Sequence, residues 1–341
     1  MQFHLRYDLR NPPQWRVPFE RFYATFLEQA EWADAHGFAS LGLSEHHFVD
    51  DGYLPSPFAV GGAVAARTKR LRIGFNVVLL PLKHPVQVAE DAAIVDIISA
   101  GRIDVGFGAG YRQTEFEAYG VPISDRAGLM DEGVEIIRRC WEEEEFSFDG
   151  KHWKLRNVRA TPKPVQKPRP RIMMGGSSEA AARRAARLAD SFVPTHPSFM
   201  AAYRDELRRL GKDPGPEPPA DAPRTPMFLH VAHDTDAAWA RIAPHALYET
   251  NEYARFLASD PSAPYQTATD AEQLRASGAY VVLTPEETVA LGKRLEAALG
   301  PAAGLSFHPL MGGMPHELGQ ESLELVAREV MPHFQDGEVP R

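Results

Sequence analysis

The chain has 341 residues, of which 44% are hydrophobic and 24% are charged. This composition is ordinary for a soluble globular protein, and the length suits one large α/β barrel or two ordinary domains. The formal net charge of −9 gives no global basic field for nucleic acid or an anionic membrane, and the single cysteine, Cys140, excludes an internal disulfide and a thiolate metal cluster. We read no signal peptide and no membrane-spanning run, and we expect a cytoplasmic protein.

Strand-like and helix-like segments alternate along the chain. A first apolar strand precedes a helix that stops at Gly37, and the strand–helix unit then recurs. The sequence predicts eight strands, at 3–7, 38–43, 71–80, 103–107, 171–174, 191–193, 227–232 and 304–307. Eight such units predict an α/β fold of the (β/α)8 TIM-barrel class, as a single domain over 1–341, whereas a doubly wound sheet rarely needs this many regular repeats.

Three connections are longer than ordinary loops. One follows the fourth strand at 108–126, and another at 145–171 contains a predicted hairpin of 146–148 against 152–154. The third, 258–284, lies beyond the seventh strand and its helix and consists mostly of small and polar residues. Loops of this length are usually functional lids, so we expect insertions after strands 4 and 7, the second being either a mobile lid or a decorative insertion.

Glu45, His46 and His47 directly follow the second predicted strand. Successive residues of an extended chain point to opposite sides, so the two imidazoles are not expected to share a metal ion. We find no metal-ligand spacing in the chain and expect no metal site. An imidazole that faces the mouth of a barrel could act as a general acid or base, because histidine titrates near physiological pH. By itself, such a pair is more often explained by hydrogen bonds at a strand end.

Gly175, Gly176, Ser177 and Ser178 join the fifth predicted strand to an alanine-rich helix. Glycine lets backbone amides approach a ligand closely, and a helix start with free N–H groups and serine hydroxyls can bind an anion. The segment is therefore either a phosphate pocket or a tight turn with a serine N-cap. Glu179, in the first turn, would repel a phosphate if its side chain pointed inward.

Two further segments are out of pattern. The glycines of 106–111 do not form a dinucleotide-binding fingerprint, because Tyr111 stands where the third glycine is needed. They are expected to leave room for a flat ligand, with Tyr111 along it, or to form a flexible loop. Asn76 interrupts the apolar strand 71–80, and a buried amide there would need hydrogen-bond partners from the backbone or from a ligand.

Together these segments resemble the bacterial luciferase-like flavin-dependent monooxygenase family, most clearly over 38–195. The resemblance rests on the order and spacing of 43–48, 80–85, 89–91, 99–102, 106–111, 129–131, 175–177 and 284–287. It implies a (β/α)8 barrel that binds reduced FMN delivered by a separate flavin reductase. It also implies a reaction with O₂ through a C4a-peroxyflavin, which oxygenates a small hydrophobic organic substrate.

The resemblance also implies roles for particular residues. His46 matches the family's catalytic histidine, supported by Glu45 and His47, and 258–284 matches the mobile lid. Asn76-Val77 matches a non-prolyl cis peptide bond whose bulge backs the flavin ring. The implied cofactor-binding residues are Asn76, Val77, Ala109, Tyr111, Gly175, Gly176, Ser177 and Ser178.

Two positions depart from the luciferase α subunit. Ala109 replaces its phosphate-binding arginine, and Gly108 replaces its reactive cysteine. The phosphate charge would then be met by the helix dipole, by serine hydroxyls, or by another cation such as Arg112. These departures argue against light emission and leave the deazaflavin F420 open as an alternative cofactor.

Three functions are therefore carried forward. The first is the FMN-dependent monooxygenase. The second is an F420-dependent hydride-transfer oxidoreductase, for whose polyglutamate tail only scattered basic residues are present. The third is a non-catalytic flavin-binding protein.

A homodimer is expected, with no nucleic-acid or membrane partner. An apolar, partly aromatic mouth is expected from Phe48, Tyr53, Leu54, Phe58, Leu79, Leu80 and Tyr111.

Overall fold

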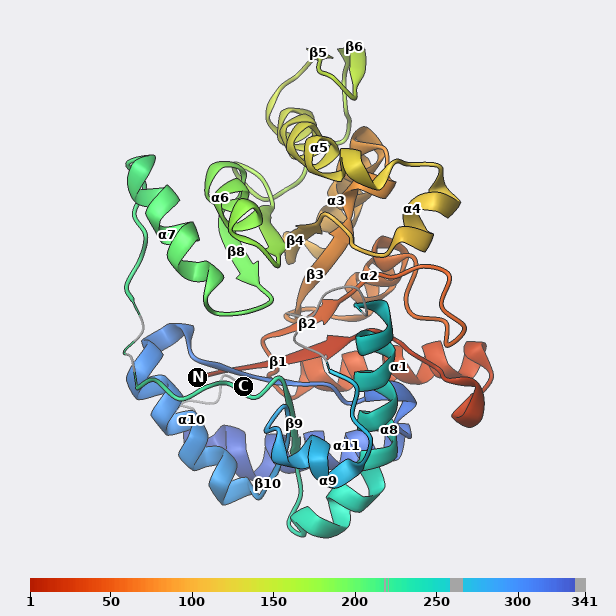
Figure 1. The fold of residues 1–341 in the computed structure, drawn as a ribbon, viewed down its shortest axis with the longest axis vertical. Coiled ribbons are helices and arrows are strands. Elements are labelled where there is room, and N and C mark those ends of the chain that lie inside the picture. The colour runs from red at the N-terminus through yellow and green to blue at the C-terminus, as the bar shows by residue number, and fades with distance from the viewer. Residues whose placement is uncertain (218, 220, 258–265, 335–341) are drawn as a thin grey trace. The chain divides into compact units, whose positions relative to one another are not determined.

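The computed structural model describes residues 1–217, 219, 221–257 and 266–334, which fall into two compact units. Unit 1 comprises Met1–Gly42, Asp50–Tyr53 and the chain from Glu217 onward, and unit 2 comprises Leu43–Val49 and Leu54–Pro216. The elements of both are labelled in Figure 1. None of the described helices combines the length and the apolar character that a membrane crossing requires.

Unit 1 contains a sheet with the strand order β10-β9-β11-β1-β2. Its pairings are parallel, with Gln2 opposite Gly304 and Tyr280 opposite Phe228. The strands are β1 (Gln2–Tyr7), β2 (Ser40–Leu43), β9 (Phe228–Val231), β10 (Tyr280–Leu283) and β11 (Gly304–Phe307). The helices are α1 (Phe19–Ala35), α8 (Thr235–Phe256), α9 (Ala271–Ala276), α10 (Pro285–Leu299) and α11 (His316–Leu325).

Unit 2 contains a sheet with the order β3-β4-β7-β8 and a separate hairpin, β5-β6. The pairs β3–β4, β4–β7 and β7–β8 are parallel, so their carboxyl ends share one edge. The strands are β3 (Arg72–Leu79), β4 (Ile103–Gly108), β5 (Phe146–Asp149), β6 (Lys154–Val158), β7 (Arg171–Gly176) and β8 (Ser191–Pro194). The helices are α2 (Pro57–Arg67), α3 (Pro85–Ser99), α4 (Gln113–Tyr119), α5 (Arg126–Glu142), α6 (Glu179–Leu188) and α7 (Phe199–Arg209).

The sequence explains the start of several helices and the burial of the strands. Thr284 and Glu287 form a reciprocal capping box at the start of α10, with Pro285 in the first turn, where its missing N–H costs nothing. Asp234 caps α8 by accepting the N–H of Ala237 at 2.9 Å. Residues Val105 to Gly108 of β4 are all buried, as expected for a parallel strand covered on both faces.

The segment 258–284, which was predicted as a lid, is described only in part. Residues 258–265 lie outside the described part of the chain, and the rest contains α9 and β10. Because β10 pairs with β9, unit 1 has one strand more than the sequence predicts there. The residues Tyr280–Leu283 are apolar, but they lie within 258–284, a stretch of mostly small and polar residues that reads as one long loop.

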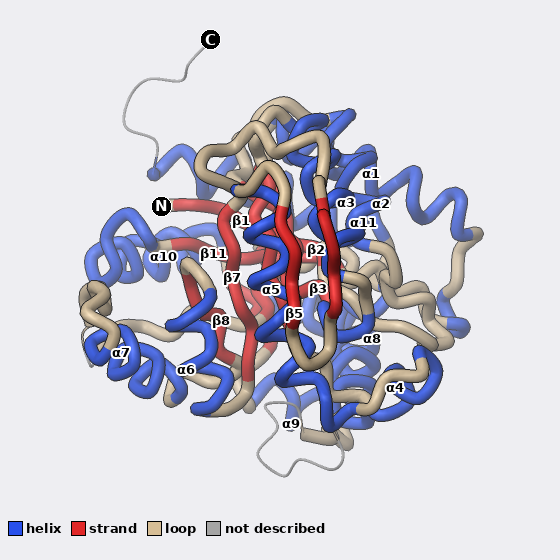
Figure 2. The backbone as a smooth tube through the Cα atoms, turned by 90° about the horizontal axis from the view of Figure 1, so that it is seen from above, coloured by secondary structure: helices blue, strands red, loops and turns tan. Residues whose placement is uncertain are grey.

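The predicted hairpin is present, but its second strand begins later. Figure 2 shows β5 beside α5, and Phe148 lies opposite Leu155. The backbone N–H groups of residues 151–153 donate instead to the carboxylate of Glu132 on α5, at 2.7 to 3.2 Å. These three residues are therefore unavailable for the ladder, and the strand starts at Lys154. The connection 108–126, predicted as a loop, contains the short helix α4.

Arg102 ties the carboxyl end of α2 to the start of β4. Its Nη1 donates to the Leu71 carbonyl at 2.6 Å and to Thr68 Oγ1 at 2.9 Å, and its Nη2 donates to the carbonyls of Ala65 and Thr68 at 3.0 Å. Its Nε donates to the Ser99 carbonyl at 2.7 Å. Carbonyls at a helix end have no partner within the helix, so one guanidinium satisfies groups that would otherwise need water.

We expect Arg102→Lys to lower the free energy of unfolding by about 2 kcal/mol, because an ammonium keeps the charge but cannot reproduce the planar fork of donors. The measurement is urea denaturation, with Arg156→Lys on the exposed face of β6 as the matched control. Equal midpoints for the two variants would contradict this assignment.

Candidate functional site

His46 lies in the segment that follows β2, within unit 2, and both of its ring nitrogens have partners. Nδ1 lies 2.9 Å from Oε1 of Glu115, and Nε2 lies 3.0 Å from the hydroxyl of Tyr111. The imidazole is 5% exposed, whereas Tyr111 is 39% exposed. The three side chains therefore form a hydrogen-bonded series. Its exposed end is the phenol of Tyr111, and the His46 ring lies behind it.

Glu115, on α4, is the acceptor that holds this segment in place. Its Oε1 accepts the backbone N–H of His47 at 2.8 Å and Nη1 of Arg112 at 3.0 Å, in addition to the His46 ring. Burial by itself would raise the pKa of Glu115, but the hydrogen bond and charge of His46, the His47 N–H and Arg112 together hold that pKa below its ordinary value. The carboxylate is therefore ionised at neutral pH.

The charge of Glu115 determines the tautomer of His46. An ionised carboxylate only accepts hydrogen bonds, so Nδ1 of His46 must carry a proton. In the neutral imidazole, Nε2 is then an acceptor and the Tyr111 hydroxyl is its donor. The arrangement fixes a basic nitrogen at one defined point, next to a hydroxyl that can exchange a proton with a ligand.

His47 belongs to a second, separate group of polar side chains. Its Nε2 lies 2.8 Å from Oε1 of Glu45, and its Nδ1 lies 3.2 Å from the hydroxyl of Tyr119. Glu45 also pairs with Nζ of Lys83 at 2.7 Å and accepts the N–H of Leu79 at 2.8 Å. Glu45 and His47 therefore attach the segment to the end of β3, and the side chain that holds His46 is Glu115, which sequence reasoning missed.

The Asn76–Val77 peptide bond is cis, and the register of β3 against β4 shifts between Phe75 and Val78. The geometry that the family resemblance implied at this position is therefore present. Asn76 is exposed at the bulge, so it is not the buried amide that its place in an apolar strand suggested.

The glycines of β4 and β7 make room for this bulge. A Cβ on Gly106 would lie 2.6 Å from the Phe75 carbonyl oxygen, and one on Gly108 would collide with Val77 Cγ2. A Cβ on Gly175 would lie 3.1 Å from Val77 Cγ1. The space expected for a flat ligand beside Gly106 and Gly108 is thus filled by β3 itself, and Val77 forms a platform above the glycines.

The predicted cofactor-binding residues lie at or just beyond the carboxyl ends of β4 and β7 or at the β3 bulge, and every one of them keeps some exposure. Val77, Ala109, Gly175 and Gly176 are half-buried. Asn76, Tyr111, Ser177 and Ser178 are exposed. A platform of backbone and small side chains with a phenol beside it is suited to a planar heterocycle, so these residues fit a flavin.

The start of α6 is suited to the phosphate end of such a ligand. Ser178 is the N-cap and accepts the Ala181 N–H at 3.2 Å, while the Ser177 hydroxyl makes no hydrogen bond within the described residues. Glu179 pairs with Arg183 along the helix at 2.9 Å, so its carboxylate is turned to that partner. Arg112 is held by Glu115 and the His47 carbonyl, which removes it as a candidate phosphate ligand.

Most of the residues expected to line an apolar mouth belong to the core. Tyr53, Leu54, Leu79 and Leu80 are all buried, and Phe58 is half-buried. Phe48, at 62% exposed, and Tyr111 remain accessible. Tyr119, which was not predicted, packs against Phe48 with ring centroids 5.6 Å apart.

Unit 1 contains a buried polar cluster that the sequence did not reveal. Nε2 of His308 lies 3.3 Å from Asp8, its Nδ1 lies 3.5 Å from Glu249, and Arg10 pairs with Asp8 at 3.1 Å. Three such side chains are close enough to share a metal ion. However, burial lowers the pKa of His308 less than the two carboxylates raise it, which favours an imidazolium with no lone pair to donate. We interpret the cluster as an ion-pair network.

The model of the luciferase-like monooxygenase family matches residues 10–297. The chain belongs to this family. The (β/α)8 fold class predicted from the sequence is confirmed, because the similar solved structures are luciferase-like barrels.

Two monooxygenases and one dehydrogenase illustrate the range of similar proteins. The oxygenase component of the flavin-dependent trigonelline monooxygenase of Acinetobacter baylyi is 30% identical over 155 residues, which are 45% of this chain and 43% of that protein. Monooxygenase RslO1 of Streptomyces bottropensis shares the fold with a TM-score of 0.80 and 27% identity, over 98% of this chain and 100% of that one. An F420-dependent secondary alcohol dehydrogenase, at 21% identity, has a TM-score of 0.68 over 98% of this chain and 100% of that one.

The matches to the first curated relatives span about half the length of those proteins. Membership of the luciferase-like family supports an oxidoreductase of the flavin-dependent monooxygenase type.

We expect Glu115→Gln to lower the free energy of unfolding at pH 7 by about 2 kcal/mol, because the amide cannot compensate the buried charge of Arg112 and is a weaker acceptor for the His46 ring. The folded-state pKa of Glu115 is depressed, so its contribution is present above the unfolded value of about 4.3 and is lost as the pH falls through the folded value. The difference between the variant and the wild type should therefore shrink in acid. Urea denaturation at several pH values measures this.

The matched control is Glu117→Gln, on the exposed face of the same helix. A similar loss in both variants would mean that the effect reflects the helix and not the contacts of Glu115.

Proposed function

We propose that this protein is the oxygenase of a two-component monooxygenase that uses reduced FMN and O₂ to oxygenate a small hydrophobic organic substrate. The observation that carries the proposal is the chain Tyr111–His46–Glu115, which ends at a half-exposed phenol directly after β4. A buried base that is oriented by a carboxylate and reaches the surface through one hydroxyl is a proton-transfer device.

His46 and Tyr111 would move the proton. With Nδ1 committed to Glu115, His46 can take a proton only at Nε2, and that atom faces the Tyr111 hydroxyl at 3.0 Å. Tyr111 would touch the reacting molecule and pass its proton to or from His46. Glu115 would stabilise the imidazolium while it exists, as a positioning residue.

Reduced FMN, when bound, would supply the electrons that activate O₂. We assign its ring to the platform formed by the Asn76–Val77 bulge with Ala109 and Tyr111, and its phosphate to the turn of Gly175, Gly176, Ser177 and Ser178. Donors at the start of α6 and the Ser177 hydroxyl would meet the phosphate charge. This leaves Tyr111 at the edge of the ring site, since it lies just beyond the end of β4, with His46 in contact with its hydroxyl.

The substrate would enter beside an aromatic surface. Phe48 and Tyr119 are 62% and 43% exposed and lie in contact, and His47 contacts both rings. Exposed aromatic side chains next to a proton-transfer group favour an apolar substrate.

Since a family relative is an oxygenase component, we assign the supply of reduced FMN to a separate reductase.

An F420-dependent hydride-transfer oxidoreductase is the second candidate, supported by the fold shared with an F420-dependent dehydrogenase. Its polyglutamate tail would need free cations near the start of α6. Arg112, Arg183 and Arg184 are each engaged by a carboxylate, of Glu115, Glu179 and Asp131 respectively. This occupancy is why we favour FMN. A non-catalytic flavin-binding protein is the third candidate.

We also propose a homodimer that forms through α3. Ile94, Ile97 and Ile98 share one face of this helix and are 44%, 37% and 47% exposed. Three isoleucines together on a surface are costly in water and are typical of an interface.

The function is tested by mixing the protein with reduced FMN and O₂ in a stopped-flow instrument. We expect the return of oxidised-flavin absorbance to be slower than in free solution, and His46→Ala to lower the yield of oxygenated product by 100-fold or more, a typical order for a lost acid–base group, roughly 10² to 10⁴. Tyr111→Phe, which removes only the hydroxyl, should lower the yield about tenfold. Direct titration with FMN, reduced FMN and F420 should show the tightest binding for reduced FMN.

Tyr203→Phe is the matched control, because Tyr203 lies on α7 and its ring packs against Phe192 and not against His46. Tighter binding of F420 with no reaction with O₂ would favour the second candidate. Unchanged properties in His46→Ala, apart from stability, would favour the third.

We expect Ile94→Glu to convert a dimer to a monomer, because a buried carboxylate at an apolar contact costs several kcal/mol. Light scattering after size-exclusion chromatography measures the mass. Leu210→Glu, an exposed apolar residue at the end of α7, is the control, and a wild-type monomer would contradict the proposal.

A further inference from the structure

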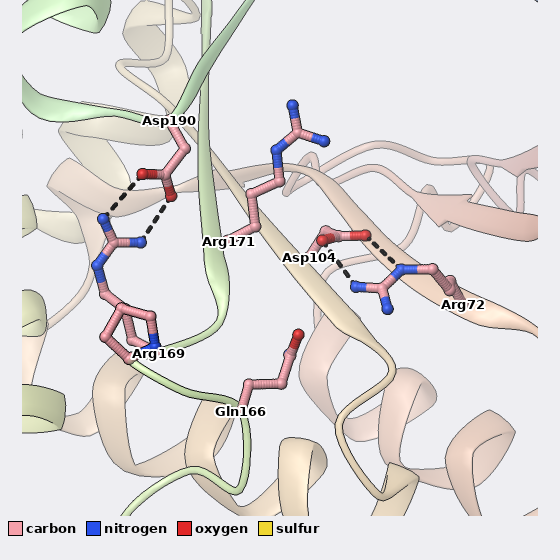
Figure 3. A pocket seen from close by; sticks show the side chains of 7 residues that line it. Arg72, Asp104, Gln166, Arg169, Arg171 and Asp190 are labelled. Carbon is pink, nitrogen blue, oxygen red and sulfur yellow. Dashed lines mark hydrogen bonds and ion pairs between the residues drawn. The ribbon is translucent and has the colours of Figure 1, made fainter. Parts of the chain in front are cut away.

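Unit 2 contains a cavity of about 460 Å³ at the amino-terminal ends of its parallel strands. Its lining comes from the first residues of β3, β4 and β7 and from the segments that precede β7 and β8 (Figure 3). The lining residues are Arg72, Asp104, Gln166, Pro168, Arg169, Arg171 and Asp190. The predicted cofactor residues occupy the opposite ends of β4 and β7, roughly 13 to 17 Å away along the strands.

Two of the three arginines are fixed by bidentate ion pairs. Nε and Nη2 of Arg72 donate to Asp104 at 3.0 and 2.8 Å, and Nη1 and Nη2 of Arg169 donate to Asp190 at 2.6 and 2.9 Å. Such pairs hold each guanidinium in one orientation. Both aspartates of the lining therefore form ion pairs with two of its three arginines.

The third arginine, Arg171, forms no ion pair with a described carboxylate, although its charge helps to lower the pKa of Asp190. It is exposed at the start of β7, and no hydrogen bond or ion pair joins it to another described residue. In Figure 3 its guanidinium lies apart from both ion pairs. Nη1 of Arg72 likewise makes no hydrogen bond within the described chain. Donors from two arginines are therefore available at one cavity.

The charges that face the cavity favour an anion. The lining carries one positive charge in excess, in a chain whose formal net charge is −9. Two nearby acids do not face it. Glu142 pairs with Nε of Arg169 at 3.1 Å from outside the lining. Asp96, behind Gln166, accepts two backbone N–H groups and the Gln166 amide.

We propose that this cavity binds a multiply charged oxyanion, a phosphate or polycarboxylate group, with Arg171 as its principal ligand. The planar guanidinium fork matches the oxygen atoms of either group. The volume is in the range of small-molecule sites, so the pocket has room for an anionic group that is carried on a larger body. The site is separate from the proposed flavin site and does not depend on it.

The test is isothermal titration calorimetry of the full chain, without flavin, at constant ionic strength. One arm uses inorganic phosphate and the other citrate, and the arm that binds more tightly identifies the source of the oxyanion. We expect Arg171→Ala to weaken binding at least about tenfold, as expected for a lost charge-assisted hydrogen bond, and Arg171→Lys to weaken it less. Because Arg171 is exposed and unpaired, both variants should keep the wild-type melting temperature.

Two further variants locate the ligand. Arg156→Ala removes the same charge from β6 and should bind as the wild type does. Ser178→Ala alters the start of α6, where phosphate would bind if it occupied the proposed flavin site. The proposal is overturned if the wild type binds neither anion, if Arg156→Ala weakens binding as much as Arg171→Ala, or if only Ser178→Ala weakens it.

Discussion

The buried carboxylate of Glu115 is the interaction on which the arrangement of the site depends. One oxygen atom accepts from the His46 ring, from the backbone of His47 and from Arg112. Without that negative charge, an arginine and an imidazole would face each other in a buried place, and the segment after β2 would lose its carboxylate anchor on α4. The proton position on His46, and with it the role of Tyr111, follows from this one charge.

The β3 bulge depends on a different constraint, which is space. Val77 can lie across the strands only because Gly106, Gly108 and Gly175 present no side chain to it. These glycines therefore allow β3 to pack closely against β4 and β7. The surface offered to a ligand is the bulge that they support. The sequence prediction that these glycines leave room for a ligand therefore locates the site correctly, but the group that fills the space beside them is Val77.

The sequence predicts most of the strands and helices of this protein, because they appear in it as apolar runs and amphipathic periods. It also predicts His46, Tyr111 and the serines of the β7–α6 turn as neighbours of strand ends, although their roles stay predictions. Glu115 was missed for a physical reason: it lies on a seven-residue helix within a segment that reads as a loop, and its partner is 69 residues away. The strand β10 was missed because it lies within 258–284, a stretch of mostly small and polar residues that reads as one long loop.

The position of Tyr111 has a consequence for how such proteins diversify. The histidine and its carboxylate are sealed inside and depend on each other, so neither can change without the other. The exposed phenol is one residue of the segment that follows β4, and its hydroxyl lies 3.0 Å from Nε2 of His46. Evolution could therefore alter the reactivity presented to a new substrate by replacing a single outer residue, while the inner base is inherited unchanged.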